Sequence, residues 1–256
     1  MIKKIGILTF QDSINYGAIL QAYALQTYLS DLSKENHVSI INYVNPKRKY
    51  SQIKGIRKVV SLIWNNSFGL LFRDAKRLKR TKAFKRKFFR LTQNFKSRSQ
   101  LLNASSVFDY YIVGSDQVWN PRNTNSDLSY FFDFVEDDKT KISYAPSFGG
   151  TSVNDAFISG TKILLERFKK ISIRENAGLT ILRDKYSLDA KVVCDPVFLL
   201  KREKWIDIID ERLIKEKYIL CYYMPGDKKG EDMILSISVE ITAMRSCGIL
   251  PYPMKQ

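Results

Sequence analysis

Residues 5–44 have the sequence IGILTFQDSINYGAILQAYALQTYLSDLSKENHVSIINYV, and this stretch decides the class of the fold. Its first six residues, Ile5 to Phe10, form a short apolar run typical of a buried strand. After a polar turn, apolar residues recur at helical spacing: Ala18, Ala22, Leu25, Leu29 and Leu32. Residues 38–44 have the pattern of a second strand. This order predicts a β-α-β unit with parallel strands and a right-handed crossover.

The alternation continues along the chain. Further strands are predicted at residues 108–113, 130–135, 141–144, 171–173 and 191–194, with a helix at 176–185. We therefore predict an α/β fold, a Rossmann-like, doubly wound and mostly parallel sheet over residues 1–213. The pattern restarts with a strand at 218–223 and a helix at 231–245. We predict that residues 214–256 form only the first βα unit of a second, incomplete Rossmann-like domain, because so few elements cannot close a core.

The positive charge of the chain is concentrated in one segment. The formal net charge is +16, from 42 basic and 26 acidic residues, but 18 of the basic residues and one acid lie between Lys47 and Arg98. We interpret residues 47–98 as a basic helical insert. Its aromatic residues suit either nucleic-acid stacking or a bilayer surface, or else packing on the sheet domain: Trp64, Phe68, Phe72, Phe84, Phe88 and Phe89. We favour packing for the aromatics and keep a membrane-facing role for the charges.

Composition excludes several classes of protein. With 45% hydrophobic residues, 12 Gly and 7 Pro among 256, the chain is globular. Cys194, Cys221 and Cys247 form no C-x-x-C pair, so neither a disulfide framework nor a zinc site is indicated, and a reducing cytoplasm fits best. No signal sequence or membrane-spanning run is evident. His37 is the single histidine, and we expect no metal site and no Ser-His or Cys-His pair.

Two candidate binding loops follow predicted strands, where ligands of open α/β sheets bind. The first is Ser13 to Gln21, and its alternative role is a capped helix start with one glycine for close packing. The loop lacks the G-x-G-x-x-G pattern, so a dinucleotide has no support. The second runs from Gly114 to Pro121, and its alternative role is a simple turn that ends at the proline.

Three weaker candidates also follow strands. Ser143 to Gly150, which includes Ser147, has small residues that would let backbone amides approach an anion, although such turns are common. Arg174 is suited to gripping a carboxylate or phosphate, or else to an ion pair with Glu175 or another acid. Asp195 is expected to cap a turn.

Taken in order, these blocks resemble the polysaccharide pyruvyl transferase family. The resemblance spans about residues 5–226 and rests on five blocks: Ile5 to Phe10 with Asn15 to Gln26, Gly114 to Asn120, Ile142 to Gly149, Ile171 to Glu175, and Val193 to Pro196. The residues Phe84, Phe88, Leu91 and Thr92 are similar to that family's helical insert. Several ordered blocks are far more specific than any one of them.

The resemblance implies two Rossmann-like domains facing across a cleft, similar to the GT-B glycosyltransferases. The implied reaction transfers pyruvate from phosphoenolpyruvate to a sugar of a cell-surface polysaccharide or lipid-linked precursor, as a ketal. It needs an acid, cations for two anionic groups and help in deprotonating a hydroxyl, but no metal or redox cofactor. Carried over, the substrate-binding residues are Asn15, Tyr16, Gly17, Gln21, Gly114, Ser115, Asp116, Gln117, Trp119, Asn120, Ser147 and Arg174, with Arg174 and Asp116 as the catalytic candidates.

One departure from the family concerns the second domain. The family's histidine and further basic residues thought to act in catalysis lie there, and we expect the general acid to lie there too. This sequence ends at Gln256, where the second strand of that domain should run. We therefore expect a truncated product with impaired catalysis.

Two other functions stay open. One is a GT-B-like glycosyltransferase, which would require a sugar nucleotide. The other is a non-enzymatic module that binds anions, membrane or nucleic acid through residues 47–98. Because no nucleic-acid-binding fold surrounds that segment, we expect no nucleic-acid partner. The expected partners are phosphoenolpyruvate, a saccharide or lipid-linked acceptor, and the anionic inner face of the cell membrane, for a cytoplasmic protein.

Overall fold

The computed structural model describes residues 2–46, 68–136, 138–209 and 233, and for residues 68–74 it describes the backbone alone. The chain divides into two compact units, Met1–Lys204 and Trp205–Gln256. The strand predicted at 218–223 and the helix predicted at 231–245 lie outside the described residues apart from residue 233, as do residues 47–67 of the basic insert.

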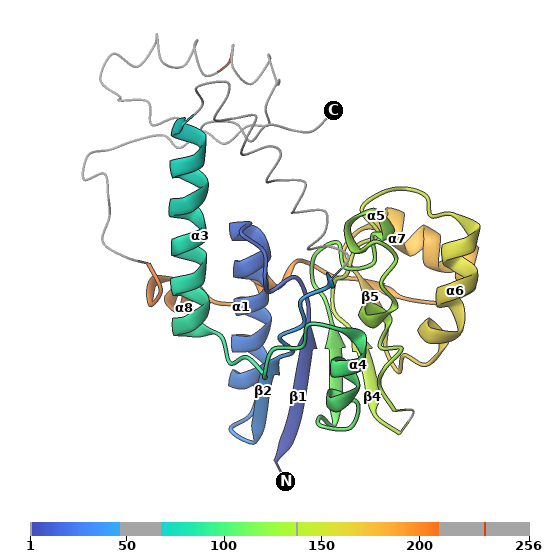
Figure 1. The fold of residues 1–256 in the computed structure, drawn as a ribbon. Coiled ribbons are helices and arrows are strands. Elements are labelled where there is room, and N and C mark those ends of the chain that lie inside the picture. The colour runs from blue at the N-terminus through green and yellow to red at the C-terminus, as the bar shows by residue number, and fades with distance from the viewer. Residues whose placement is uncertain (1, 47–67, 137, 210–232, 234–256) are drawn as a thin grey trace. The chain divides into compact units, whose positions relative to one another are not determined.

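A parallel sheet forms the centre of the first unit (Figure 1). Its strands are β1 (Lys3–Leu8), β2 (Asn36–Ile40), β3 (Tyr110–Val113) and β4 (Thr140–Ser143), in the order β2-β1-β3-β4. A second parallel pair joins β5 (Ser172–Ile173) to β6 (Lys191–Val192). A parallel bridge from Ile142 to Lys170 places β5 beside β4, and another from Ile40 to Leu91 extends the opposite edge. The predicted α/β fold with a mostly parallel sheet is thus confirmed.

Helices connect the parallel strands. The long ones are α1 (Tyr16–Asp31), α3 (Phe68–Phe88) and α6 (Asp155–Glu166). The shorter ones are α4 (Arg98–Leu101), α5 (Pro121–Thr124), α7 (Asn176–Ile181), which continues as a π-helical turn (Leu182–Tyr186), and α8 (Arg202–Ile206). Short 3₁₀ turns cover Leu102–Ala104, Leu128–Phe131 and Pro196–Phe198. In Figure 1, α3 and α1 lie beside β2 and β1, and α6 lies at the opposite side of the unit.

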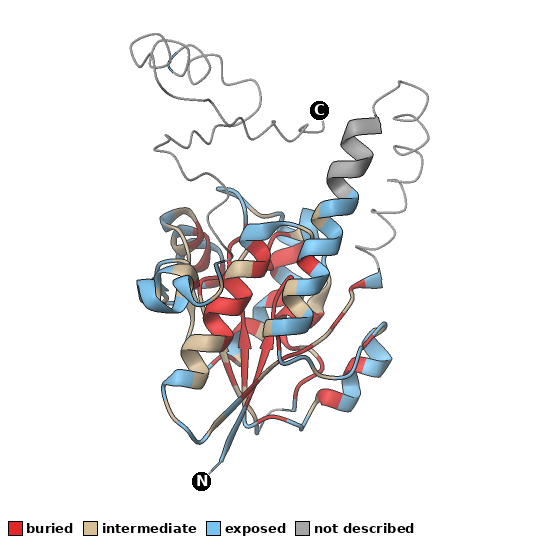
Figure 2. Ribbon diagram, turned by 90° about the vertical axis from the view of Figure 1, so that its left-hand side faces the viewer, coloured by how far each residue is buried: buried red, intermediate tan, exposed pale blue. Residues whose placement is uncertain are grey.

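The core explains why these segments take these forms. Most apolar residues of strands β1 to β4 and of the sheet-facing side of α1 are buried (Figure 2), and on α1 they repeat with the period of a helix. The rings of Phe84 and Phe88 on α3 pack edge-on against Tyr23 of α1, with centroids 5.6 Å apart in both pairs. The expectation that these two aromatics pack on the sheet domain is confirmed.

Two sequence-based assignments are corrected. Residues 130–135 are not a strand but a 3₁₀ turn and loop, in which Phe132 has a positive φ of 57° and the aromatic rings fill the core. A continuous apolar run has no periodicity that distinguishes a buried strand from a buried turn. Leu91 does not continue the helix of Phe84 and Phe88, since α3 ends at Phe88 and Leu91 bridges to the sheet edge.

Candidate functional site

The strand order creates a topological switch point between β1 and β3. The chain moves outward from β1 to β2 and Leu91, then returns to β3 on the other side of β1. The loops that leave β1 and β3 therefore diverge above neighbouring strands, which is where open α/β sheets bind ligands. The two predicted binding loops, Ser13 to Gln21 and Gly114 to Pro121, are these loops.

Gln21 joins the two loops. It lies in the first half of α1 and is 2% exposed. Its side-chain Nε2 donates to Thr9 Oγ1 at 2.9 Å and to the Ala18 carbonyl at 2.9 Å, and its Oε1 accepts from the Ser115 amide at 3.0 Å. Thr9 in turn donates to the Ser115 carbonyl at 3.1 Å. Gln21 is thus a buried brace that holds the β1 and β3 loops in a fixed relation.

The start of α1 forms the outer part of the site. Asn15 caps the helix, with Oδ1 accepting from the Gly17 amide at 2.8 Å and the Ala18 amide at 3.4 Å, and its own amide donates to Ser13 Oγ at 3.0 Å. These bonds confirm the capped helix start that the sequence analysis gave as the alternative role of this loop. Asn15, Tyr16 and Gly17 are all exposed. The same residues therefore shape the helix start and face solvent at the edge of the sheet where ligands bind.

The β3 loop is tightly built around Gly114. This glycine has a φ of 113°, and a Cβ atom there would lie 2.2 Å from the Tyr144 carbonyl oxygen. The next residue, Ser115, is fully buried, with its hydroxyl 2.8 Å from the Ala145 carbonyl. Asp116 and Gln117 are half-buried, and Asp116 Oδ1 accepts from the Gln117 amide at 2.8 Å. Asp116 is thus the carboxylate of this loop that remains partly open to solvent.

Other predicted residues of this region have structural partners. Trp119 has no exposed surface, stacks on Phe131 and donates its indole N–H to the Tyr130 carbonyl at 3.1 Å. Asn120 caps α5 through the Arg122 amide at 3.0 Å and donates to Gln117 Oε1 at 2.9 Å. Ser147 is buried, and its Oγ accepts from the Gly149 amide at 2.9 Å. These three residues form the base of the loops, below the exposed positions.

Arg174 and Asp195 bring two further strand ends to the site. Arg174 follows β5, and its Nη1 lies 3.4 Å from Asp195 Oδ2, while its Nε lies 3.7 Å from Glu175 Oε2. Asp195 follows β6, and its Oδ2 also lies 3.4 Å from Ser115 Oγ. The ion-pair role for Arg174 that the sequence left open is thus present. Asp195 also caps the following turn, as expected, through the Val197 amide at 3.1 Å.

The contacts of Asp195 with Ser115 and Arg174 were not predicted from the sequence. Through these two residues, Asp195 connects the ends of β3, β5 and β6. The signal available from the sequence was its place directly after a strand. Its partners depend on the strand order, which that local pattern does not contain.

Two tyrosines near the strand ends have perturbed acidities. Burial, together with the adjacent Cys194, raises the pKa of Tyr144 to about 12. Burial together with Asp127 raises the pKa of Tyr43, whose hydroxyl donates to Asp127 Oδ2 at 2.7 Å. Both phenols are therefore neutral proton donors at neutral pH. Among the described residues, no three His, Cys, Asp or Glu side chains gather as metal ligands would.

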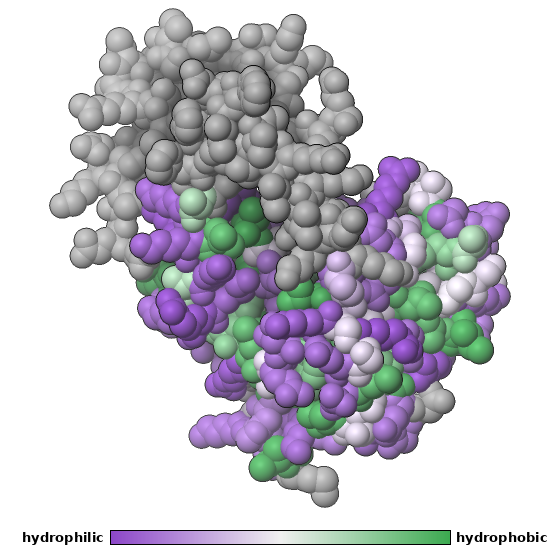
Figure 3. Space-filling view, viewed as in Figure 1, coloured by the Kyte–Doolittle hydropathy of each residue, from purple (hydrophilic) through white to green (hydrophobic). Residues whose placement is uncertain are grey.

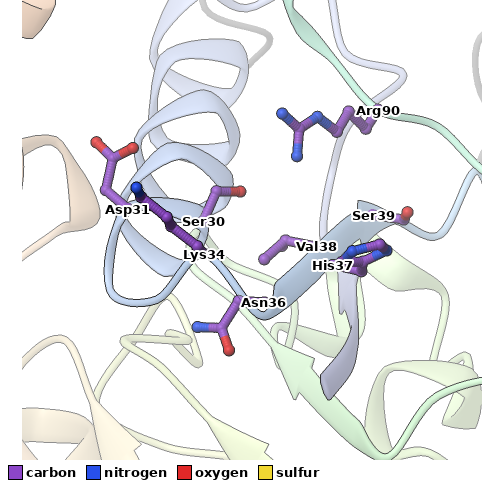
Figure 4. Close-up of a pocket in the computed structure, with 8 residues that line it drawn as sticks. All are labelled: Ser30, Asp31, Lys34, Asn36, His37, Val38, Ser39 and Arg90. Carbon is purple, nitrogen blue, oxygen red and sulfur yellow. The ribbon is translucent and has the colours of Figure 1, made fainter. Parts of the chain in front are cut away.

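A hollow of about 420 Å³ lies elsewhere, at the amino end of β2 (Figure 4). It is lined by Ser30, Asp31, Lys34, Asn36, His37, Val38, Ser39 and Arg90. Its rim is exposed, and it lies at the opposite end of β2 from the loops described above. Because parallel α/β sheets bind substrates at the carboxyl ends of their strands, we place the functional site at the loops and not in this hollow.

Comparison with known proteins assigns the chain to a family. A model of the polysaccharide pyruvyl transferase family matches residues 15–243, a range that includes every candidate residue named above except Thr9 and Ser13. No individual curated protein matches the chain. Within the described residues, no helix is both long and apolar enough to cross a membrane. From the extent of the family match, the chain belongs to the polysaccharide pyruvyl transferase family.

Proposed function

We propose that this chain transfers pyruvate from phosphoenolpyruvate to a sugar of a cell-surface polysaccharide or lipid-linked precursor. In the balanced reaction, two sugar hydroxyls add to the enol carbon of the donor and form a ketal. The vinyl CH₂ gains a proton and becomes a methyl group, and inorganic phosphate leaves. Nothing is oxidised or reduced, so we propose no resident cofactor.

The observation that carries the proposal is the state of the Arg174 guanidinium. A guanidinium has five N–H donors. Among the described residues, the Arg174 guanidinium donates one hydrogen bond, to Asp195. Its side chain is 28% exposed at the carboxyl edge of the sheet. Asp195 and Glu175 orient the group at long distances of 3.4 and 3.7 Å, so several N–H donors stay open to an anion. The carboxylate or phosphate of phosphoenolpyruvate suits such a fork.

Asp116 is the proposed base for the acceptor hydroxyl. One carboxylate oxygen, Oδ1, is held by the Gln117 amide, which fixes the orientation of the group. Oδ2 makes no hydrogen bond to the described residues and belongs to a half-buried side chain. It is suited to accept a proton from a sugar hydroxyl as that hydroxyl attacks. Asn15, Tyr16 and Gly17 would line the acceptor side of the same opening.

The two-domain arrangement is also part of the proposal. We place the general acid in the second Rossmann-like domain, of which residues 214–256 are predicted to form only the first βα unit. The chain is proposed to act in the cytoplasm, where phosphoenolpyruvate is available.

Calorimetric titration with phosphoenolpyruvate tests the proposal. We expect binding by the wild-type chain, weakened about 10- to 100-fold in Arg174→Ala, because charge-assisted hydrogen bonds contribute about 1.5–3 kcal/mol. The matched control is Arg183→Ala, an exposed arginine in the π-helical turn, which should bind like wild type. Equal binding by Arg174→Ala, or no binding by the folded wild-type chain, would refute a donor site at Arg174. Binding of a sugar nucleotide instead would favour the glycosyltransferase alternative.

A further inference from the structure

The outward face of α3 carries an unusual arrangement of charge. Six cationic side chains are exposed on its described part, and we call them the α3 cationic surface: Lys76, Lys79, Arg80, Lys82, Arg86 and Lys87. Lys79 and Arg80 each lie about one helical turn from Lys76, and Arg86 and Lys87 continue the same face two turns later. No acidic residue occurs between positions 75 and 88.

The opposite face of α3 is occupied by packing within the unit. Phe84 and Phe88 contact Tyr23, Thr81 is buried, and the Arg77 guanidinium lies over the Tyr16 ring, 5.1 Å from its centroid. These rings pack within the unit, and Lys87 Nζ lies over the Phe88 ring, 4.9 Å from its centroid. In the space-filling view, hydrophilic side chains are interspersed with hydrophobic ones on the visible surface of the region where α3 lies (Figure 3).

This arrangement is unfavourable for an isolated helix. Like charges three or four residues apart destabilise a helix, and the α3 cationic surface contains several such pairs, among them Lys79 with Lys82 and Lys82 with Arg86. Lys85 also experiences this repulsion. Burial lowers the pKa of Lys85, Asp12 opposes this shift, and Lys82 adds to it. A surface kept only for solubility would intersperse both signs of charge.

We propose that the α3 cationic surface docks the protein on an anionic lipid bilayer. Clusters of about four to eight Lys and Arg on a helix are typical of binding to anionic headgroups, whose charge relieves the mutual repulsion. The surface extends along a straight helix for about 17 Å, at 1.5 Å per residue, and thus presents a row of charges to a plane. Arg90, two residues beyond α3, continues it to the hollow that Lys34 lines.

A lipid partner fits better than nucleic acid for two reasons. Phe84 and Phe88 pack against Tyr23, and Lys87 covers the Phe88 ring, so these two rings are not open platforms for bases. The second reason rests on the proposed function, since an acceptor carried on a lipid would have to be met at the membrane. Arg77 and Tyr16 connect α3 directly to the start of α1, so docking would bring the site loops near the bilayer.

Vesicle sedimentation tests the proposal without donor or acceptor, so its outcome is independent of the activity. We expect binding to phosphatidylcholine vesicles that contain roughly one-third phosphatidylglycerol, and no binding to pure phosphatidylcholine. Lys79→Gln, Lys82→Gln and Arg86→Gln together should weaken binding roughly 100-fold, because each cation near the surface contributes about fivefold. Salt near 0.5 M should abolish binding.

The matched control removes three exposed lysines from the opposite side of the unit: Lys162→Gln, Lys169→Gln and Lys185→Gln. It has the same net charge as the first variant and should bind within about threefold of wild type. Circular dichroism checks that both variants fold. Equal losses in the two variants, no binding by wild type, or tighter binding to a DNA duplex than to the vesicles would each overturn the proposal.

Discussion

Replacing Gln21 by methionine should destabilise the fold and loosen both site loops together. Methionine has a similar length and fills the same buried space, so the change removes the three hydrogen bonds of Gln21 with little loss of packing. The Ser115 amide, in a residue with no exposed surface, loses its acceptor. Thr9 Oγ1 keeps its bond to the Ser115 carbonyl but loses the Gln21 donor.

The magnitude follows from these bonds. A buried amide left without a partner costs about 1–3 kcal/mol, and the loss of the bond to Thr9 adds about 1 kcal/mol. We therefore expect the free energy of unfolding to fall by about 2–4 kcal/mol in Gln21→Met. That is a large share of the stability of a typical domain, about 5–15 kcal/mol.

Urea denaturation followed by circular dichroism measures the change. Hydrogen exchange measured by mass spectrometry should show faster exchange in peptides that contain Ser115. The control is Gln93→Met, the same substitution at an exposed glutamine, for which we expect less than about 0.5 kcal/mol. A Gln21→Met protein as stable as wild type, with unchanged exchange at Ser115, would refute the bracing role.

Three further predictions concern the same region. Gly114→Ala should prevent folding or lower the free energy of unfolding by more than about 3 kcal/mol, because the added Cβ would lie 2.2 Å from the Tyr144 carbonyl oxygen. The control is Gly150→Ala, which should be neutral in thermal unfolding because nothing lies within 4 Å of its added Cβ. Trp119→Ala should lower the free energy of unfolding by about 3–5 kcal/mol, since the Trp119 ring is fully buried. A variant that is as stable as wild type but no longer binds phosphoenolpyruvate would instead show that Trp119 contacts the donor. Burial raises the pKa of Tyr144 from 10.0 to about 12, so the unfolded chain loses this proton first and stability should fall as the pH rises from about 10 to about 12. Tyr144→Phe should flatten this fall in urea titrations at pH 9 and 11, and an unchanged slope would contradict the assignment.

Local pattern predicted most of the strands. Apolar, β-branched runs at 108–113, 141–144, 171–173 and 191–194 all correspond to observed strands, and the helix predicted at 176–185 corresponds to α7 and its π-helical turn. The helix α6 was not predicted, although Asn154 caps it and Phe157, Ile158, Thr161 and Leu165 follow helical spacing. The run at 130–135 failed as a strand because burial on all sides removes the alternation that marks one.

The sequence also predicted only part of the candidate site. Strand-to-helix alternation was enough to place Asn15, Asp116 and Arg174 at one edge of the sheet, since the carboxyl ends of parallel strands share an edge. It was not enough to show that Trp119 packs in the core, or that Gln21 faces Ser115. Those facts depend on which side of a loop faces inward, and that is settled by contacts across many residues of sequence.

The sequence by itself therefore determined the α/β class, the family and the loops at the strand ends, because each is encoded in short patterns of hydrophobicity and side-chain type. The tertiary structure alone decided the strand order, with β1 and β3 adjacent and the switch point between them. It also decided the contacts of Ser115 with residues 94 positions earlier and 80 positions later in the chain. Such contacts arise from packing the whole unit around one core, and no local propensity specifies them.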